Sequence, residues 1–463
     1  MRQTASVRAA VRSASVAALG GLLFGYDISV TNGAVKALQG HFHIGNAALG
    51  FSAAAALMGA AVGAVITGRI ADRVGRLAMM KLAAALFLSC GLGAGLAGQI
   101  WMFIIFHCIG GIGIGIASVV GPAYIAEISP PHIRGRLGSL QQLGIVLGIC
   151  GSLVVNWLPF HIAGGSRGEL WLGLPAWRWT FIGEVIPALV YGVLVFTIPE
   201  SPRYLVAAQR IPEARRVLAM LGASVDRTVN RIAETLKSET PPSWRDLRKP
   251  GGGVYGIVWV GLGLAIFQQF VGITVIFYYS DVLWEHVGFP EQSSFTIALF
   301  TSVVNVLITL VAIALIDRTG RRPLLLAGSA GMAVTLATLT VVFFTAPVVN
   351  GKPSLTGASA PIALIAANVF VVAFAISWGP ILWVLLGEMF PNRIRSAALG
   401  LAAAAQWLAN WTITVTFPAL RHTLDAAYGF YTVCAVLSFV FVWRWVRETN
   451  GVSLEDMHAE LLR

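Results

Sequence analysis

Long runs of apolar residues, separated by short polar segments, make up most of this chain of 463 residues. A helix needs about 20 apolar residues to cross the roughly 30 Å hydrocarbon core of a bilayer. We predict twelve transmembrane helices from runs of that length. They span roughly residues 15–37, 49–70, 78–98, 101–123, 139–159, 179–198, 254–279, 294–316, 323–345, 361–386, 397–419 and 427–446.

The predicted helices form two groups of six, separated by a polar stretch. Within it, the segments EARRVLAML (213–221) and RTVNRIAETLK (227–237) place apolar residues at helical spacing. That spacing favours short amphipathic helices over a disordered linker. We therefore divide the chain into an N-terminal half, a cytoplasmic linker, a C-terminal half and a cytoplasmic tail, at residues 1–199, 200–250, 251–446 and 447–463.

The composition is that of a membrane protein. Hydrophobic residues make up 57% of the chain, charged residues 11%, and the mean hydropathy is +0.77. Soluble domains carry about 25% charged residues, so this chain has too few to cover a soluble surface. The cysteines Cys90, Cys108, Cys150 and Cys434 lie in apolar runs without CxxC spacing. We interpret them as packing residues, and we expect no metal and no cofactor.

The net charge of +11 has a topological explanation. Lysine and arginine are retained in the cytoplasmic segments of membrane proteins. If the N-terminus is cytoplasmic, all but five of the 32 lysines and arginines lie on that side. We therefore predict a multi-pass protein of the bacterial inner membrane with both termini in the cytoplasm. Because the basic residues are spread across many loops, we expect no nucleic-acid partner.

The two halves share an internal repeat. The segment EISPPHIR (127–134) matches EMFPNRIR (388–395), and DRVGR (72–76) matches DRTGR (317–321). Each pair follows the corresponding helix of its half, either helix 4 and 10 or helix 2 and 8. Two parallel six-helix repeats are the architecture of major facilitator transporters, whose substrate site lies between the halves. The repeat alone therefore indicates a transporter, and the sequence shows no complete catalytic motif of an enzyme.

The repeated charged loops predict a cytoplasmic gate. Arginine side chains can bind carboxylates and the carbonyls at helix C-termini, so such clusters can hold two halves together. The alternative is positive-inside charge with no further role, but the repetition of the D-R-x-G-R and E-x6-R patterns favours a gate. The predicted gating residues are Asp72, Arg73, Arg76, Glu127, Arg134, Glu200, Arg203, Asp317, Arg318, Arg321, Glu388 and Arg395.

A set of longer motifs resembles the sugar porter family of the major facilitator superfamily, and within it the bacterial sugar/proton symporters. The resemblance covers nearly the whole chain and implies an all-α fold of twelve helices that moves a monosaccharide by alternating access, as a monomer in the lipid bilayer. The motifs are GGLLFGYD (20–27), GRIADRVGR (68–76), YIAEISPPHIRGR (124–136), PESPRYL (199–205), QQFVGITVIFYYS (268–280), DRTGRRPLL (317–325), WGPILWVLLGEMFPNRIR (378–395) and AAQWLANW (404–411).

Amides and indoles are the side chains that suit a sugar. An amide both donates and accepts hydrogen bonds, as sugar hydroxyls do, and an indole packs on the C–H face of the ring. Gln268 and Gln269 are adjacent in an apolar run, where a single glutamine is commonly a helix–helix hydrogen bond. The resemblance instead implies sugar binding by Phe24, Gln142, Gln268, Gln269, Thr274, Trp383, Gln406, Trp407 and Asn410, and an outer gate at Tyr278 and Tyr279.

This chain departs from the family pattern at two positions. The family usually has asparagine where this chain has Thr274, so the site loses reach and at least one donor, which affects which sugar is accepted. The symporters carry arginine where this chain has His107. Histidine is charged only when protonated, so we expect coupling that depends more on pH than in arginine-bearing relatives.

Asp27 is the one acid in the first apolar run. At 1.5 Å rise per residue, Asp27, His107 and Glu184 lie about 12, 9 and 8 Å below the outer surface of the core. A charged acid at such depth costs about 2.5–3.5 kcal/mol, which marks a candidate for function rather than a satisfied polar group. We predict that Asp27 takes up a proton from outside, with His107 and Glu184 as partners.

Other functions are compatible with the same motifs. The first alternative is a facilitator that carries sugar downhill without protons. A polyol transporter and a non-transporting sugar sensor are further alternatives, although sensors tend to carry long cytoplasmic tails. Hexoses such as glucose or galactose and pentoses such as xylose remain open as substrates, because the binding amides are shared among these groups.

Overall fold

The computed structural model describes residues 2–130, 133–163, 168–222, 225–237, 247–248, 252–278, 284, 291–349, 352–355, 357–391, 394–420 and 423–450. Within these ranges the chain is helical apart from its connections and one small hairpin. That hairpin pairs β1 (Val348–Val349) with β2 (Lys352–Pro353), at the end of the molecule opposite the linker helices.

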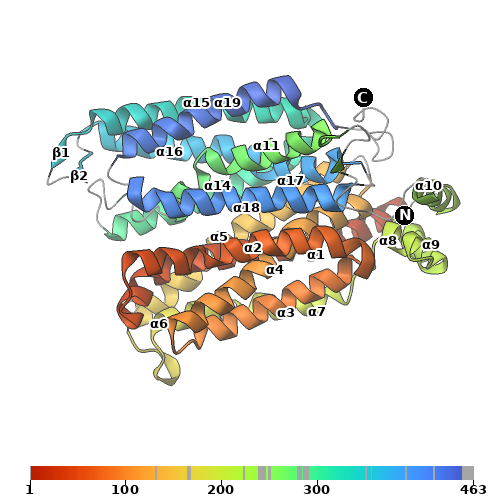
Figure 1. Cartoon of the computed structure of the whole chain (residues 1–463), viewed down its shortest axis with the longest axis horizontal. Helices are drawn as coiled ribbons and strands as arrows, with labels where there is room; N and C mark the ends of the chain where they lie inside the picture. Colours follow the sequence, from red (N-terminus) through yellow and green to blue (C-terminus); the bar gives the residue numbers. More distant parts are fainter. Residues whose placement is uncertain are drawn as a thin grey trace.

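Two bundles of helices lie side by side, and each is formed by one half of the sequence (Figure 1). The first contains α1 (Arg2–Phe42), α2 (Asn46–Val74), α3 (Arg76–Gly95), α4 (Ile100–Ile128), α5 (Arg134–Ile162), α6 (Ala176–Ile182) and α7 (Val185–Val195). The second contains α11 (Gly256–Phe270), α12 (Ile273–Tyr278), α14 (Glu291–Thr319), α15 (Arg321–Thr345), α16 (Ser359–Ala375), α17 (Trp378–Met389), α18 (Arg395–Leu420) and α19 (Leu424–Trp445).

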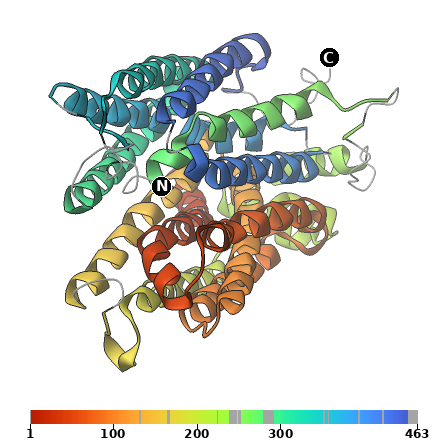
Figure 2. The same ribbon diagram turned by 60° about the vertical axis from the view of Figure 1, so that its left-hand side comes forward.

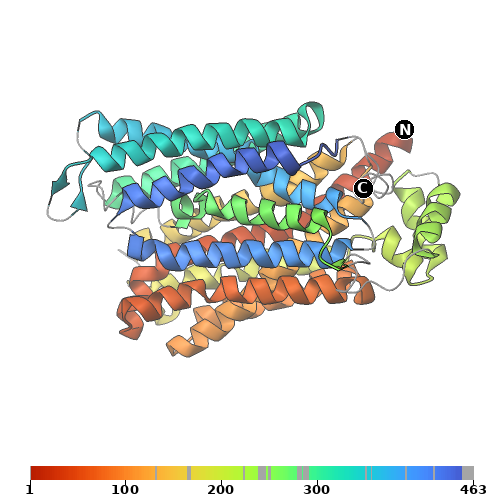
Figure 3. The same ribbon diagram turned by 45° about the horizontal axis from the view of Figure 1, so that its top comes forward.

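The linker forms short helices, as predicted. These are α8 (Pro202–Ala207), α9 (Ile211–Met220) and α10 (Val225–Lys237). They cluster beyond one end of the bundles, where α1 begins and α19 ends (Figure 3). Ser201 caps α8 by accepting a hydrogen bond from the backbone N–H of Tyr204, and Pro202 occupies the first turn, where no donor is needed.

The apolar runs predicted the membrane helices, and the structure adds breaks within three of them. The sixth crossing changes from α6 to α7 at Gly183 and Glu184, and the tenth changes from α16 to α17 at Ser377. The seventh breaks at Gly272, whose φ of +83° lies in the left-handed region that favours glycine. Each break lies beside residues of the sites described below.

Helices α2 and α5 of the first half make most of the contact with the second half. α2 packs along α18, while α5 packs along α14 and α17. The backbones of α2 and α18 approach closely, because a Cβ at Gly400 would lie 2.8 Å from the carbonyl oxygen of Ala64. The internal repeat relates crossing 2 (α2) to crossing 8 (α14), and crossing 5 (α5) to crossing 11 (α18). It therefore relates the α2–α18 contact to the α5–α14 contact. Figure 2 shows the two bundles from the side that Figure 1 presents on its left.

The outer surface of the bundles is apolar, as a lipid-facing surface must be. Phe344 is 76% exposed and Ile186 70%, although both are large hydrophobic residues. Eleven helical segments of the described chain are long and apolar enough to cross a membrane. α18 is not among them, but its 26 residues lie between the other helices and match the predicted eleventh crossing.

Candidate functional site

A cavity lies between the two bundles, with about 540 Å³ of space not filled by protein atoms. Eight of the nine residues predicted to bind sugar line it, from α1, α5, α11, α12, α17 and α18. They are Phe24, Gln142, Gln268, Gln269, Thr274, Trp383, Gln406 and Asn410. Both halves of the chain contribute the walls of this cavity.

Hydrogen bonds join the amides on the C-terminal side of the cavity. The Thr274 hydroxyl donates to Gln269 Oε1 (2.8 Å), and Gln269 Nε2 donates to Gln268 Oε1 (3.3 Å). Gln406 Nε2 donates to the same Gln268 oxygen (2.6 Å). Gln268 Nε2 donates to the carbonyl oxygen of Trp378 (3.1 Å), the first residue of α17. The adjacent residues Gln268 and Gln269 both line the cavity, close to the end of α11 at Phe270.

The N-terminal side of the cavity meets the C-terminal side through aromatic rings. Trp383 of the second half donates its indole N–H to Gln142 Oε1 of the first half (3.2 Å). Phe24 packs edge-on against Trp383 and Trp407, with ring centroids 6.3 and 4.8 Å apart. Trp407 is fully buried behind Phe24 and donates to Ser118 Oγ (3.3 Å), so it supports the wall instead of lining it.

Two acceptors in the cavity remain open. Gln406 Oε1 and Asn305 Oδ1 are buried and accept no hydrogen bond from the described residues. Buried polar atoms normally have partners, so these oxygens suit a ligand that brings hydroxyl donors. Asn305 lies on α14 and was missed by the sequence interpretation, although it is a polar residue within an apolar run.

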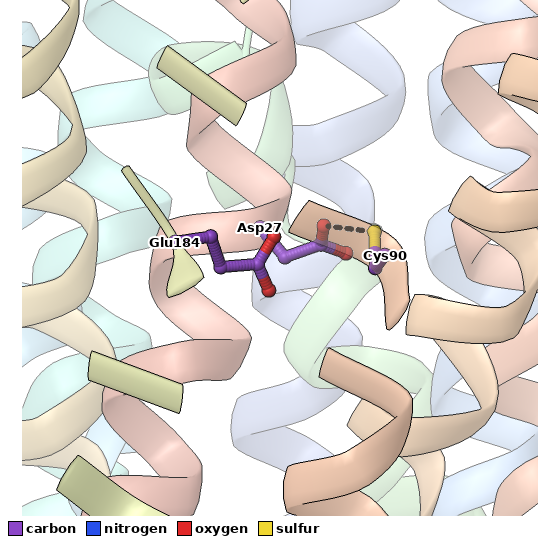
Figure 4. A group of neighbouring side chains, drawn as sticks. All are labelled: Asp27, Cys90 and Glu184. Atoms are coloured by element: carbon purple, nitrogen blue, oxygen red, sulfur yellow. Dashed lines mark hydrogen bonds between the residues drawn. The ribbon is translucent and has the colours of Figure 1, made fainter. Parts of the chain in front are cut away.

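A second cluster lies within the N-terminal bundle and contains the predicted coupling residues, of which Figure 4 shows Asp27 and Glu184. Asp27 on α1 and Glu184, at the break between α6 and α7, are both fully buried. His107 on α4 points Nε2 at Asp27 Oδ1, at 3.9 Å. The depth estimate therefore brought together three side chains that the structure also brings together. Asp27 Oδ2 and both Glu184 oxygens accept no hydrogen bond within the described chain.

The hydrogen bonds of His107 fix its tautomer. Nδ1 lies 3.1 Å from the carbonyl oxygen of Ser52, which can only accept, so Nδ1 carries a hydrogen. In the neutral ring Nε2 therefore carries the lone pair, which accepts a hydrogen bond from the Thr31 hydroxyl (3.3 Å) and faces Asp27. A proton that reaches His107 must bind on this nitrogen, beside the Asp27 carboxyl group.

The ends of the two halves beside the linker helices carry matching charge clusters. In the first half, Arg76 binds Asp72 (2.7 Å) and Glu127 (2.8 Å), while Glu200 accepts the backbone N–H groups that begin α3. In the second half, Arg321 binds Asp317 (3.1 Å) and Glu388 (2.9 Å). The central arginines are almost completely buried, so these are structural ion pairs and not surface charge.

Glu448 completes the second cluster and was missed in the sequence. Its carboxylate accepts the backbone N–H groups of Arg321 and Arg322, both at 2.9 Å, as Glu200 does for α3. The neighbouring Thr449 donates to Glu388 Oε2 (2.7 Å). A sequence signal existed, because an acid followed by serine or threonine ends the sixth and the twelfth apolar run alike.

One contact joins the second cluster to the first half. The backbone N–H of Arg136, at the start of α5, donates to Asp317 Oδ2 (3.0 Å). Of the remaining predicted gating residues, Arg134 and Arg395 are buried, Arg203 is half-buried, and Arg73 and Arg318 are exposed. Tyr279 and the Tyr278 side chain lie outside the described residues. At this end, the two halves are thus in contact through α5 and α14.

Comparisons with known proteins agree with this geometry. A family model described as sugar (and other) transporter matches residues 13–461. A glucose transport protein of Synechocystis sp. is 53% identical over 460 residues, 98% of each chain. The D-xylose-proton symporter of Escherichia coli is 37% identical over 482 residues, 96% of this chain and 94% of its own. The solved structure of the proton:xylose symporter XylE bound to 6-bromo-6-deoxy-D-glucose has a TM-score of 0.86 at 35% identity, over 98% of this chain and 100% of that one.

Proposed function

This chain belongs to the sugar porter family of the major facilitator superfamily, and we propose that it couples sugar uptake to a proton taken up through Asp27. It is a multi-pass membrane transporter of sugars and not an enzyme. The predicted all-α fold of two six-helix halves agrees with the XylE structure, apart from the small hairpin β1–β2. The proposal concerns the substrate, the coupling residue and the orientation.

The observation that carries the proposal is the pair of sites. One is an amide-lined cavity to which both halves contribute, and the other is a buried carboxyl cluster within the first half. When the halves rock about the α2–α18 and α5–α14 contacts, the cavity changes the side to which it opens. A charged carboxylate buried in a membrane core is unfavourable. If the halves rock only when Asp27 is protonated, each transport step carries a proton together with the sugar.

For the substrate we propose D-glucose or a similar hexose. The relative of 53% identity is named for glucose, and the xylose symporter shares 37% identity. The cavity offers acceptors at Gln406 and Asn305 for the ring hydroxyls and aromatic faces at Phe24 and Trp383 for the ring itself. Pentoses and polyols are the competitors to include in an uptake panel.

For the orientation we propose cytoplasmic termini and a functional monomer in the bilayer. The linker helices, the start of α1 and the end of α19 lie at one end of the molecule, and the basic loops gather there (Figure 3). Both proposed sites are complete within one chain. Thiol labelling of a cysteine introduced into α9, from each side of right-side-out vesicles, tests the orientation directly.

The test of coupling is Asp27→Asn in proteoliposomes with an imposed proton gradient. The wild type is expected to accumulate glucose and to make the outer medium alkaline, while Asp27→Asn exchanges glucose but does not accumulate it. Asp425→Asn, at the start of α19, is the control and should accumulate normally. Accumulation by Asp27→Asn contradicts the assignment of Asp27. A wild type that exchanges glucose without accumulation or alkalinisation is a facilitator. That alternative is favoured by His107, and not an arginine, lying beside Asp27 among the described residues.

A further inference from the structure

The coupling cluster contains a thiol to which the sequence interpretation gave only a packing role. Cys90 on α3 is fully buried, and its Sγ–H donates to Asp27 Oδ1 at 3.4 Å. The Cys90 sulfur and one carboxylate oxygen each of Asp27 and Glu184 all lie within 4.8 Å of one another. Figure 4 shows the three side chains converging, with a dashed line between the thiol and Asp27.

Two glycines, Gly110 and Gly91, allow close packing of the helices around this cluster. A Cβ at Gly110 on α4 would lie 2.5 Å from the Cys90 sulfur and 3.7 Å from Asp27 Oδ1. A Cβ at Gly91 would lie 3.1 Å from the Phe181 carbonyl oxygen and 3.3 Å from the Glu184 Cβ. Any side chain at Gly110 pushes the thiol away from Asp27. Gly110 therefore leaves the space in which the thiol lies against Asp27, and Gly91 allows α3 to pack closely on the segment that carries Glu184.

Cys90 supplies what the other neighbours of Asp27 do not. Among the described side chains it is the one that donates a hydrogen bond to Asp27, because His107 Nε2 at 3.9 Å is beyond hydrogen-bond distance. A buried carboxylate without a donor is strongly unfavourable, and a donor stabilises its charged form. A thiol is a weak donor, so its effect is intermediate between those of a hydroxyl and a methyl group.

We propose that Cys90 is a positioning residue of the proton-coupling cluster, whose thiol holds the Asp27 carboxylate toward Glu184 and adjusts how readily it releases its proton. The inference rests on the proposed symport through Asp27. In this arrangement the thiol takes part of the role that a fixed cation has in arginine-bearing symporters, without adding a charge. His107 then supplies charge only when it is protonated.

The test compares Cys90→Ser with Cys90→Ala and follows the external pH at which proton-driven glucose uptake falls to half. Serine donates more strongly, so its half-point is expected at lower pH, and alanine donates nothing, so its half-point is expected at higher pH. Each shift should reach about a threefold change in proton concentration or more. Cys434→Ser and Cys434→Ala replace a buried thiol of the other half and should leave the half-point unchanged. If uptake is slower in both Cys90 variants but its half-point stays at the wild-type pH, Cys90 has a packing role and the proposal is overturned.

A second variant and a spectroscopic measurement cover the case in which the Cys90 variants do not fold. Gly110→Ala keeps the thiol but displaces it, so its half-point should move in the same direction as that of Cys90→Ala. The infrared S–H stretching band, assigned in wild type against the three other cysteines, should change over the same pH range as uptake. If the wild type is proton-coupled but this S–H band does not change with pH, the inference about Cys90 is overturned and the proposed function is not. If the wild type shows no proton coupling, the proposed function and this inference are both overturned. The uptake measurement on the wild type gives that result before any variant is made.

Discussion

Thr274 shows how a single residue differs from its sequence interpretation. The sequence indicated a loss, because a hydroxyl replaces the asparagine amide that the family usually has. The structure shows that the hydroxyl donates to Gln269 Oε1 at 2.8 Å while Thr274 also lines the cavity. Thr274 therefore orients an amide that faces the substrate, and its effect on selectivity acts partly through Gln269.

Replacing Thr274 with valine keeps the shape and removes the hydroxyl. Gln269 Oε1 then loses its donor, and a hydrogen bond of this kind contributes about 0.5–1.5 kcal/mol, so the KM for glucose should rise roughly two- to tenfold. Uptake kinetics in proteoliposomes measure the change. Thr335→Val on α15, where the hydroxyl only bonds to its own helix, is the control. An unchanged KM in Thr274→Val means that Gln269 holds its position without the hydroxyl.

The residue scale also shows which positions sequence reasoning can reach. Helical rise placed Asp27, His107 and Glu184 at similar depth, but rise carries no information about which way a side chain points. Cys90 and Asn305 were missed for the same reason, since each is a small or polar residue in an apolar run outside the quoted motifs. Their roles depend on helix rotation, which is set by packing against neighbouring helices.

At the scale of elements, the length of the apolar runs predicted the crossings but not their breaks. An apolar run in the sequence does not show where the backbone hydrogen bonds of a helix are interrupted. The structure shows these points, at the left-handed Gly272 and at Ser377. These breaks matter because they carry function. The break between α6 and α7 presents Glu184 to Asp27, and the end of α11 lets Gln268 and Gln269 line one cavity.

Glu448 tests how the charge clusters stabilise an element. Its carboxylate accepts the first backbone N–H groups of α15, where the helix dipole favours negative charge. Glu448→Ala should therefore lower the free energy of unfolding by about 1–2 kcal/mol, the range for loss of a helix N-cap. Thermal unfolding in detergent measures it, and Glu200→Ala should behave alike at α3. Glu213→Ala, which removes an exposed ion pair with Arg210, should change the melting temperature less; equal shifts in all three variants contradict the capping role.

At the scale of the whole molecule, the internal repeat predicted two parallel halves, but it did not indicate which side is closed. The structure shows a contact between the halves at the end beside the linker helices, where Asp317 of the second half accepts the Arg136 N–H of the first half. The contact is tight, because a Cβ at Gly135 would lie 2.1 Å from Asp317 Oδ1 and 2.6 Å from Arg321 Nη2. Closure therefore depends on a position where only glycine fits.

Gly135→Ala is expected to favour the inward-open arrangement. The added methyl group cannot coexist with the Asp317 contact, so the halves separate at the cytoplasmic side while each half keeps its fold. The labelling rate of a cysteine at Val384, which is buried under this contact beside Gly138, should rise several-fold with a maleimide added from the cytoplasmic side. Gly151→Ala lies on the same helix with nothing within 4 Å of its Cβ, so it should label as the parent does. Equal labelling of the two variants would mean that the α2–α18 contact, and not Asp317, keeps the cytoplasmic side closed.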